Sequence, residues 1–449
     1  MTAGWAAAVP RPAHEAHVEL PGDPASAAVR LARSGIGDQY AVYERRGTWH
    51  FATGLAGSVT VDAERVRAWS GGHGYETPTA GKPLERVTEL LATLPDAGWR
   101  GYGWASFELA HLLRGKAPGP GPLFHLFLPR VEVELTRGGA RIRAASEEDL
   151  RRAAQLLART EAAPAVHPLP VSLDAGAEPY RRAVARTVED IKAGRLNKAV
   201  LSRVLPLPDG LDLFATYLAG RTAATPARSF LFDMGGWRAA GFSPETVVEI
   251  GSDRRISTQP LAGTRALGQD PGENTRLREQ MLNDPKEVIE HAVSVRLAFE
   301  ELAEVCDGGT VSIGEFMAIR KRGAVQHIAS RVSGKLRDGV TPWSAFAALF
   351  PAVTATGVPK AAALDVIRDR ESAPRGLYGG AVFMTDADGT LDAALTLRTV
   401  FQRDGRNWLR AGAGIMGQST PEREWEETCE KLRSVAPHLR ARTEGATKA

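Results

Sequence analysis

Cysteine is scarce in this sequence, which has only Cys306 and Cys429 among its 449 residues. Two thiols do not make a disulfide framework or a thiolate metal site, so we expect a reduced, cytoplasmic setting. Runs of like charge and basic-aromatic stripes are also missing, and the formal net charge is only +3. The sequence therefore lacks the electrostatic pattern of a nucleic-acid-binding protein.

Long apolar runs are missing as well. None is long enough to span a bilayer, and residues 1–17 lack the basic start and apolar core of a signal peptide. We therefore expect no contact with a membrane. Because no extended apolar stripe is left over for a partner subunit, we also expect a monomer.

Turns that contain glycine separate short strands, and the strands do not alternate with single helices. Each of the dipeptides at 46–47, 138–139, 235–236, 388–389 and 404–405 joins two segments that alternate like strands. Helical periodicity lies between the strand groups, over residues 85–94, 147–160, 180–193, 285–302, 343–350 and 360–370. This order predicts an α+β fold of packed antiparallel β-sheets, with a sandwich-like core and peripheral helices.

A segment with three prolines, residues 161–178, divides the chain. We expect it to connect an N-terminal part of the α+β unit, residues 1–160, to a catalytic part, residues 179–441. Residues 442–449 are expected to form a short polar tail.

The stretch over residues 408–432 is the most informative for function. It predicts a strand that runs into a turn at Gly412, Gly414 and Gly417, followed by a helix over about 421–439. The glycines fit the G-x-G-x-x-G pattern of dinucleotide-binding proteins. That fold needs a second strand with an acidic residue after the helix. Only a short tail remains here, so we reject a nicotinamide cofactor.

Two pairs of glutamates stand at predicted helix starts. Glu424 and Glu427 share a helix face with Lys431, because residues three and four apart are neighbours on a helix. Glu287 and Glu290 repeat the three-residue spacing behind a predicted N-cap. Each pair alone can be helix capping and solvated surface. Four carboxylates without thiolates also suit a hard divalent cation such as Mg²⁺.

Other polar residues interrupt apolar surroundings. Lys198 opens a predicted strand, where it either snorkels at the sheet edge or is partly buried, with a lowered pKa that suits a general base. Glu245 follows a Ser-Pro turn, and His327 lies between apolar residues; each is either an ordinary structural residue or part of a site. Arg398 alternates with apolar residues along a strand predicted over 393–401. If it faces inward, it needs an anionic partner.

Ten segments in unbroken order resemble the chorismate-utilising enzymes, which include isochorismate synthases, salicylate synthases and anthranilate synthase component I. The segments are LNKAVLSR, AGFSPE, PLAGTRALG, PKEVIEHAVSVR, GAVQHIAS, LFPAVTATGVPK, APRGLYGGAV, LDAALTLR, WLRAGAGI and PEREWEETCEKL. They cover the chain from about residue 179 onward, whereas the N-terminal part is similar only loosely. Across nearly every segment the similarity is strongest to the salicylate synthases of siderophore pathways.

The resemblance implies a reaction with water. Lys198 occupies the position at which the family activates water, whereas the ammonia-using anthranilate enzymes carry glutamine there and need a glutaminase partner. Lys198 would be the general base, and Glu245 the general acid that protonates the departing C4 hydroxyl of chorismate. Ala262 stands where the aminodeoxychorismate synthases carry a nucleophilic lysine, which disfavours that branch.

The resemblance also implies a set of binding residues. Glu290 and Glu427 would hold Mg²⁺, with Glu287 and Glu424 as further or water-mediated ligands. The substrate-binding residues would be Gly263 and Thr264 near the ring carboxylate, His327 and Thr354 beside the ring, and Tyr378, Arg398, Gly412, Gly414 and Lys431 around the pyruvyl carboxylate.

The function expected from the resemblance is conversion of chorismate through isochorismate to salicylate and pyruvate, without a glutaminase subunit. One alternative is an isochorismate synthase that stops at the first product. An ammonia-using relative and an inactive scaffold on the same fold remain further alternatives. The sequence departs from the salicylate synthases at Gln259, where they carry glutamate, and this difference bears on the second step.

Overall fold

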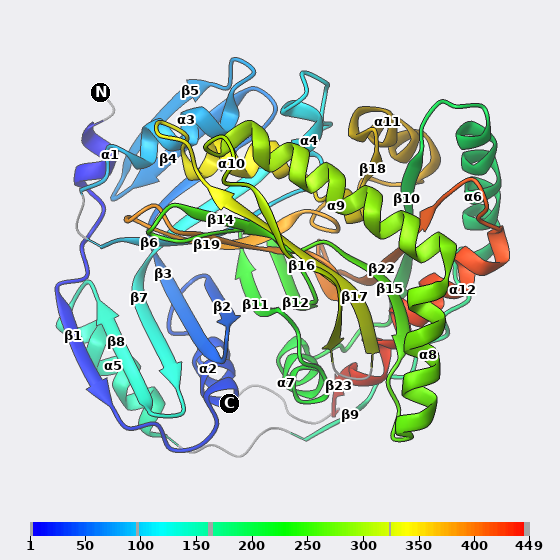
Figure 1. Cartoon of the computed structure of the whole chain (residues 1–449). Coiled ribbons are helices and arrows are strands. Elements are labelled where there is room, and N and C mark those ends of the chain that lie inside the picture. The colour runs from blue at the N-terminus through cyan, green and yellow to red at the C-terminus, as the bar shows by residue number, and fades with distance from the viewer. Residues whose placement is uncertain (1–2, 96–97, 160–164, 323–324, 444–449) are drawn as a thin grey trace.

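The computed structural model describes residues 3–95, 98–159, 165–322 and 325–443 (Figure 1). None of the helices in these ranges has the length and apolar content needed to cross a membrane. The α-helices described are α1 (Ala3–Ala7), α2 (Pro24–Arg33), α3 (Pro83–Leu91), α4 (Leu109–Leu112), α5 (Glu147–Ala158), α6 (Ala177–Lys192), α7 (Leu213–Ala223), α8 (Pro271–Asn283), α9 (Pro285–Val305), α10 (Pro342–Leu349), α11 (Lys360–Arg370) and α12 (Pro421–Arg433).

The strands pair antiparallel throughout the described ranges. They are β1 (His14–Val18), β2 (Tyr40–Arg45), β3 (Thr48–Val61), β4 (Arg65–Ser70), β5 (His73–Pro78), β6 (Arg100–Ala105), β7 (Phe124–Thr136), β8 (Gly139–Ala144), β9 (Val166–Pro168), β10 (Lys198–Leu207), β11 (Arg228–Met234), β12 (Trp237–Ser243), β13 (Thr246–Ile250), β14 (Arg255–Thr258), β15 (Leu261–Ala266), β16 (Ser312–Arg322), β17 (Val325–Lys335), β18 (Gly357–Val358), β19 (Ala381–Asp386), β20 (Leu391–Leu395), β21 (Thr399–Arg403), β22 (Arg406–Ile415) and β23 (Arg440–Arg442).

The two longest strands, β3 and β7, belong to two layers at once. The first half of β3 pairs with β2, the second half pairs with β4, and a bulge between Leu55 and Gly57 interrupts its ladder with β7. Bulges bend and twist a strand, which is how one strand can serve two sheets. From this pair, one layer continues through β2, β11, β12, β21, β22 and β10. The other continues through β6, β19, β20, β13, β14 and β17.

Apolar side chains fill the space between the layers and cover their outer faces. Aromatic residues from both layers, including Tyr43, Trp104 and Phe230, form the cluster between them. Helices α2, α5 and α7 cover the first layer, and α3, α9 and α10 cover the second. Figure 1 shows α9 and α10 on one side of the strands and α2 and α7 on the other. The α+β fold with packed antiparallel sheets and peripheral helices is therefore confirmed.

After β11, two short connections carry the chain directly from one layer to the other. It leaves β12 at Ser243 and enters β13 at Thr246, and it leaves β20 at Leu395 and enters β21 at Thr399. The two crossings are hydrogen-bonded to each other: Leu395 N donates to Glu245 O at 3.1 Å, and Ser243 Oγ donates to the carbonyls of both residues. Glu245 and Arg398 thus lie on adjacent backbone segments, although about 150 residues separate them in the sequence.

Several expectations about single elements are wrong. The strand predicted over 393–401 is two strands, β20 and β21, in different layers. The glycine turn begins only after Ile415, because β22 runs through Gly412 and Gly414 and pairs with β10. The helix predicted to reach residue 439 ends at Arg433. The described part of the expected connecting segment includes β9, which pairs with β23, and the division of the chain itself stays a prediction.

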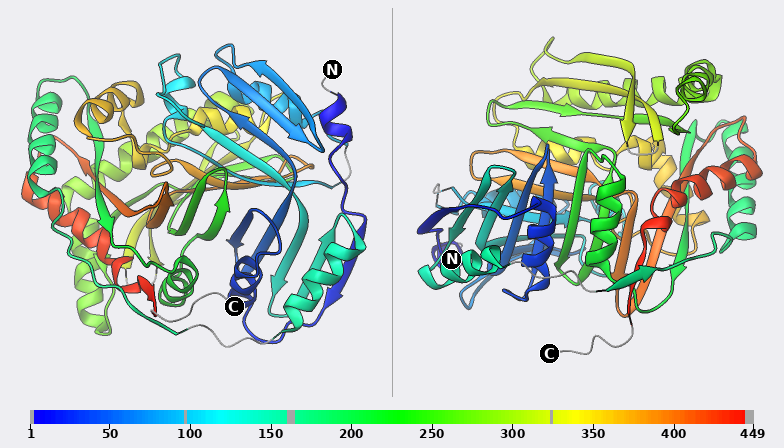
Figure 2. Two further views of the ribbon diagram at one scale, coloured as in Figure 1. Left: turned by 180° about the vertical axis from the view of Figure 1, so that it is seen from behind. Right: turned by 90° about the horizontal axis from the view of Figure 1, so that it is seen from below.

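At one edge of the molecule, α6 and α12 pack side by side, as both the front and rear views show (Figure 2). Helix α12 also packs on β22, and α11 packs on β10. These helices hold the glutamate pair of α12 against the strand that carries the glycines.

We expect the buried carboxylate of Asp392 in β20 to be essential for the contact between the layers. It accepts hydrogen bonds from Arg228 Nε and Nη2 of β11 at 2.7 and 2.6 Å and from Tyr43 Oη of β2 at 2.5 Å. Asp392→Asn should lower the free energy of unfolding by about 3 kcal/mol, because it leaves the Arg228 charge buried and poorly compensated. Urea unfolding measures this. The control, Asp365→Asn, breaks an exposed pair with Lys116 and should cost less than about 1 kcal/mol. Equal losses in both variants would contradict the role of Asp392.

Candidate active site

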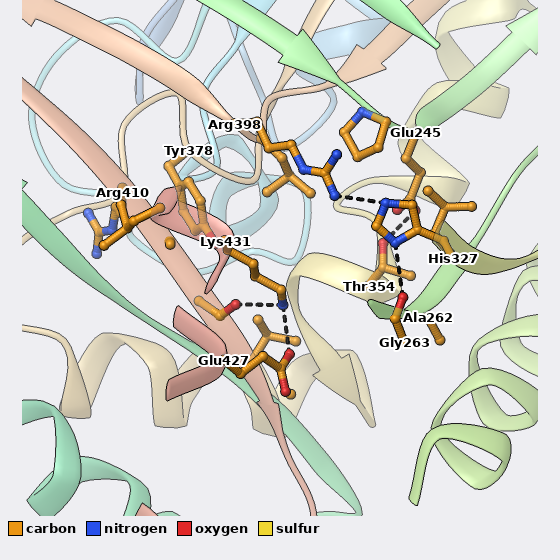
Figure 3. Close-up of a pocket in the computed structure, with 18 of the residues that line it drawn as sticks. Glu245, Ala262, Gly263, His327, Thr354, Tyr378, Arg398, Arg410, Glu427 and Lys431 are labelled. Atoms are coloured by element: carbon orange, nitrogen blue, oxygen red, sulfur yellow. Dashed lines mark hydrogen bonds and ion pairs between the residues drawn. The ribbon is translucent and has the colours of Figure 1, made fainter. Parts of the chain in front are cut away.

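A cavity of about 100 Å³ lies beside the two crossings (Figure 3). Most of the residues singled out from the sequence line it: Glu245, Gly263, Glu287, Glu290, His327, Thr354, Tyr378, Arg398, Gly412, Gly414, Glu427 and Lys431. Lys198 and Glu424 do not line this cavity. The side chain of Thr264 falls outside the part of the chain that the structure describes.

Glu245 is a buried carboxyl group, 4% exposed, at the first crossing. Thr354 Oγ1 donates a hydrogen bond to Glu245 Oε1 at 2.5 Å. Burial raises the pKa of Glu245 to about 8, against a partly compensating effect of Thr354 and Lys198. The group is therefore largely protonated at pH 7 and can donate a proton to a bound molecule.

His327 is held as a neutral imidazole. Burial and the adjacent Arg398 guanidinium lower its pKa to about 3. Its Nδ1 lies 2.9 Å from Gly263 O and its Nε2 lies 2.8 Å from Arg398 Nη2. An arginine can only donate and a carbonyl can only accept, so Nδ1 carries the proton and Nε2 accepts.

Arg398 connects the two layers and does not alternate along a strand as predicted. Its φ of +50° places it in the left-handed region, which a non-glycine residue occupies only when its surroundings enforce it. Within the described ranges, no carboxylate oxygen lies within 4 Å of its guanidinium. Burial and Arg322 lower its pKa to about 10, so it stays charged at pH 7. An uncompensated arginine that lines a cavity suits an anionic ligand.

Three carboxylates on the opposite part of the cavity are partly neutralised by lysines. Glu290 Oε1 lies 2.9 Å from Lys198 Nζ, and Glu427 Oε1 lies 2.8 Å from Lys431 Nζ. Burial and the carboxylates of Glu290 and Glu427 raise the pKa of Glu287. This repulsion indicates that the three groups share one electrostatic environment that favours added positive charge.

The remaining glutamate of the predicted metal set, Glu424, is fully buried beside Lys286, whose Nζ lies 3.0 Å from Glu424 Oε1. Among the described residues, no group of three or more histidine, cysteine, aspartate or glutamate side chains is already gathered around one point in the manner of a metal site. The all-oxygen donor set nevertheless fits Mg²⁺, which takes few protein ligands and keeps its waters. Binding would require the lysine ammonium groups to give up their contacts with Glu290 and Glu427.

Lys198 lies behind Glu290 as seen from the cavity. Its ammonium group is fully buried, with Glu290 Oε1 at 2.9 Å and Ser294 Oγ at 3.4 Å. The position of β10 beside β22 explains this burial, because Val200 pairs with Gly414 and Lys198 pairs with Val358. A Cβ added at Gly414 would overlap the Glu290 carboxylate, so glycine is needed for Glu290 to reach this position.

Tyr378 and Lys431 complete the wall near Gly412. Lys431 Nζ donates to Gly412 O at 2.8 Å, and a Cβ at Gly412 would lie 2.9 Å from Tyr378 Oη. In Figure 3 these residues lie on one side of the cavity, and Glu245, Thr354 and His327 lie on the other. The cavity thus presents the charge of Arg398 at one end and lysine–carboxylate pairs at the other, with a proton donor between apolar walls that include Leu261 and Leu397.

Sequence reasoning missed Lys286 and Arg410. Lys286 carries the charge that holds the α12 glutamates, and Arg410 lines the cavity with its guanidinium bonded to Glu371 Oε2 at 2.5 Å and Ser202 Oγ at 2.8 Å. Lys286 lies in the segment PKEVIEHAVSVR and Arg410 in the segment WLRAGAGI. The rule applied to Arg398, that an arginine on an apolar strand needs an anionic partner, would have identified Arg410.

Comparisons of the sequence and the fold with known proteins point to one family. A family model described as chorismate binding enzyme matches residues 38–437. A salicylate synthase of Mycolicibacterium paratuberculosis is 41% identical over 435 residues, which are 94% of each chain.

Two further relatives match less closely. Anthranilate synthase component 1 of Geobacillus stearothermophilus is 36% identical over 258 residues, which are 58% of this chain and 51% of that protein. The structure of the menaquinone-specific isochorismate synthase of Escherichia coli superposes with a TM-score of 0.73 at 20% identity, covering 95% of this chain and 94% of that one. At this identity the superposition supports the fold alone.

The raised pKa of Glu245 predicts how its proton contributes to stability. The folded chain keeps this proton up to pH 8, whereas the unfolded chain loses it near pH 4.5. The stabilisation is therefore complete below pH 4.5 and is lost as the pH rises to about 8. Glu245→Gln mimics the protonated form, so relative to wild type it should gain a few kcal/mol of unfolding free energy between pH 5 and pH 9. Urea unfolding at both pH values measures this.

Glu148→Gln, on the exposed face of α5, is the matched control and should follow the wild-type profile. A Glu245→Gln profile parallel to wild type would show that Glu245 is already ionised at pH 5.

Proposed function

The chain belongs to the chorismate-binding enzyme family, and from this membership we propose that it is a Mg²⁺-dependent salicylate synthase. It would convert chorismate through isochorismate to salicylate and pyruvate. The observation that carries the proposal is a carboxyl group that is neutral at pH 7, Glu245, in one cavity with the uncompensated Arg398. The choice within the family rests on the 41% identity to a salicylate synthase over nearly the whole chain.

In the first step, water adds at C2 of the ring and the C4 hydroxyl leaves. Glu245 gives its proton to the departing oxygen, which leaves as water, and the ring double bonds move from C1–C2 and C5–C6 to C1–C6 and C4–C5. Lys198, as the neutral amine, would accept the proton of the attacking water. Its Nζ is buried behind Glu290, 2.9 Å from Glu290 Oε1, so this role requires the ion pair to open and the Nζ to reach the cavity. An acid and a base with different surroundings can work at one pH.

Arg398, Tyr378 and Lys431 hold the anionic substrate during this step. Arg398 is oriented by its hydrogen bond to the neutral His327, so the guanidinium faces the cavity without a competing carboxylate. The Tyr378 hydroxyl supplies a donor beside Gly412. A planar guanidinium and a hydroxyl together fix both the position and the plane of a carboxylate.

In the second step, isochorismate loses pyruvate to give the aromatic ring. The side-chain ether bond breaks at the ring carbon while a ring hydrogen moves to the enolpyruvyl group. This rearrangement needs a substrate held in a reactive conformation more than it needs a further acid or base. Thr354 and His327, held by hydrogen bonds to Glu245 and Gly263, are placed to restrict the ring.

Mg²⁺, when bound, would neutralise and orient the ring carboxylate of the substrate. Glu290 and Glu427 would hold it, with Glu287 and Glu424 as further or water-mediated ligands. The mutual repulsion of Glu287, Glu290 and Glu427 supports a cation at this wall.

An isochorismate synthase that stops at the first product is the second candidate. Gln259, which replaces a glutamate of the salicylate synthases, is buried at 4% exposure. A lost charge at such a position bears on how the intermediate is held. We further propose that the protein acts as a cytoplasmic monomer without a glutaminase subunit.

The test of function is a product assay with purified protein, chorismate and Mg²⁺, followed by chromatography. Salicylate and pyruvate in equal amounts are expected, and isochorismate alone would establish the second candidate. Lys198→Ala should form neither product while still binding chorismate, because it lacks the base. An active Lys198→Ala enzyme of normal thermal stability would overturn the base assignment.

The metal ligands are tested without turnover. Mg²⁺ titrated calorimetrically onto the free protein should bind Glu427→Gln at least tenfold more weakly than wild type, because one anionic ligand is lost. Glu426→Gln, the exposed neighbour on α12, is the matched control and should bind as wild type does. Unchanged affinity in Glu427→Gln would remove Glu427 from the ligand set.

A further inference from the structure

A second hollow of about 830 Å³, here called the outer chamber, adjoins the active-site cavity. The two share Glu287, Arg398 and Glu427 as lining residues, which places these three side chains at the boundary between them. Phe242 and Leu277 give the chamber apolar surface. A hollow of this size that ends at the reacting groups is a route for a small molecule.

The charges that line the outer chamber are unevenly compensated. Three of its arginines lie within 3.5 Å of a carboxylate: Arg265, Arg423 and Arg433. By contrast, within the described ranges no carboxylate oxygen lies within 4 Å of the guanidinium of Arg322 or Arg398. One of these two cations, Arg398, lies at the boundary between the chamber and the cavity.

Arg322 is poorly satisfied by the protein itself. It ends β16, its Nε is buried without a hydrogen-bond partner, and its Nη1 reaches the carbonyl of its neighbour Lys321 only at 3.4 Å. Burial and nearby arginines lower its pKa, and Arg322 in turn lowers the pKa of Arg398. Two like charges this close are costly unless an anion binds beside them. The exposed carboxylate of Glu430 also lines the chamber, on α12.

We propose that Arg322 is a substrate-binding residue, which captures a carboxylate of the dianionic substrate in the outer chamber and shares it with Arg398. This rests on the proposed function, in which Arg398 binds a substrate carboxylate. Two guanidinium groups around one carboxylate satisfy more of its lone pairs than one, and they draw an anion from solvent toward the cavity.

The experiment compares chorismate consumption by wild type, Arg322→Gln and Arg322→Lys. Arg322→Gln should raise KM about tenfold and change kcat less than twofold, because capture is lost while the reacting groups are untouched. Arg322→Lys should fall between, since it keeps the charge but not the planar fork. Added salt should raise KM less steeply in Arg322→Gln than in wild type.

The matched control is Arg320→Gln, two residues earlier on β16. Arg320 is ion-paired with Glu315 and does not line the chamber. It removes the same charge nearby and should leave KM within twofold of wild type. Equal changes of KM in both variants would reduce the effect to net charge and overturn the proposal.

A binding measurement separates this proposal from the proposed function. Chorismate is titrated onto Glu245→Gln and onto the double variant Glu245→Gln/Arg322→Gln, with tryptophan fluorescence as the signal. A tenfold weaker affinity of the double variant supports Arg322 even where wild type forms no product, a result that would overturn the function alone. Equal affinities would overturn Arg322 alone, and no binding to either would overturn both.

Discussion

The site depends on the hydrogen bonds that hold the two passages of the chain between its β-layers. Where a chain leaves one ladder for another, its backbone groups need new partners. Here each crossing supplies partners for the other, since Leu395 N donates to Glu245 O and Phe242 N donates to Arg398 O at 3.2 Å. These bonds hold the side chains of Glu245 and Arg398 in one cavity. Glu245 is a buried acid that keeps its proton, and Arg398 is a guanidinium that keeps its charge. The left-handed conformation of Arg398 is maintained by the same contacts.

The carboxylates that line the cavity have partners of opposite charge, whereas its arginine, Arg398, does not. Glu290 and Glu427 have lysine partners, whereas the side-chain partner of Arg398 among the described residues is the neutral His327. An entering dianion therefore meets a cation that is free to pair at one end. At the other end it meets a wall where ammonium groups already neutralise the carboxylates. A divalent cation would compete with those ammonium groups, so metal binding and the positions of Lys198 and Lys431 are coupled through shared carboxylates.

Much of the fold could be predicted from local sequence patterns. The wrong predictions mainly concern contacts between residues that are far apart in the sequence. Glycine turns identified the hairpins because a two-residue turn fixes the strands on either side of it. The strand predicted over 393–401 is broken because both halves are apolar, and alternation does not report which layer a strand joins. The passage of β22 through its glycines depends on pairing with β10, over 200 residues away. Lys286 was missed because its partners, Glu424 and Glu427, stand on a distant helix that sequence spacing does not connect to it. Resemblance to a family supplied the site residues whose proximity only the fold creates.

The outer chamber, which leads to the reacting groups, also combines arginines that have carboxylate partners with arginines that do not. Most of its arginines are matched by carboxylates on α9 or α12, so its surface as a whole is not strongly basic. Among the described residues that line the chamber, the uncompensated positive charge lies at the end of β16 and at the crossing between β20 and β21, next to the cavity. A field concentrated at that point guides an anion inward instead of retaining it at the rim. Arg398 then serves the chamber and the cavity alike, and its hydrogen bond to His327 keeps the guanidinium between them.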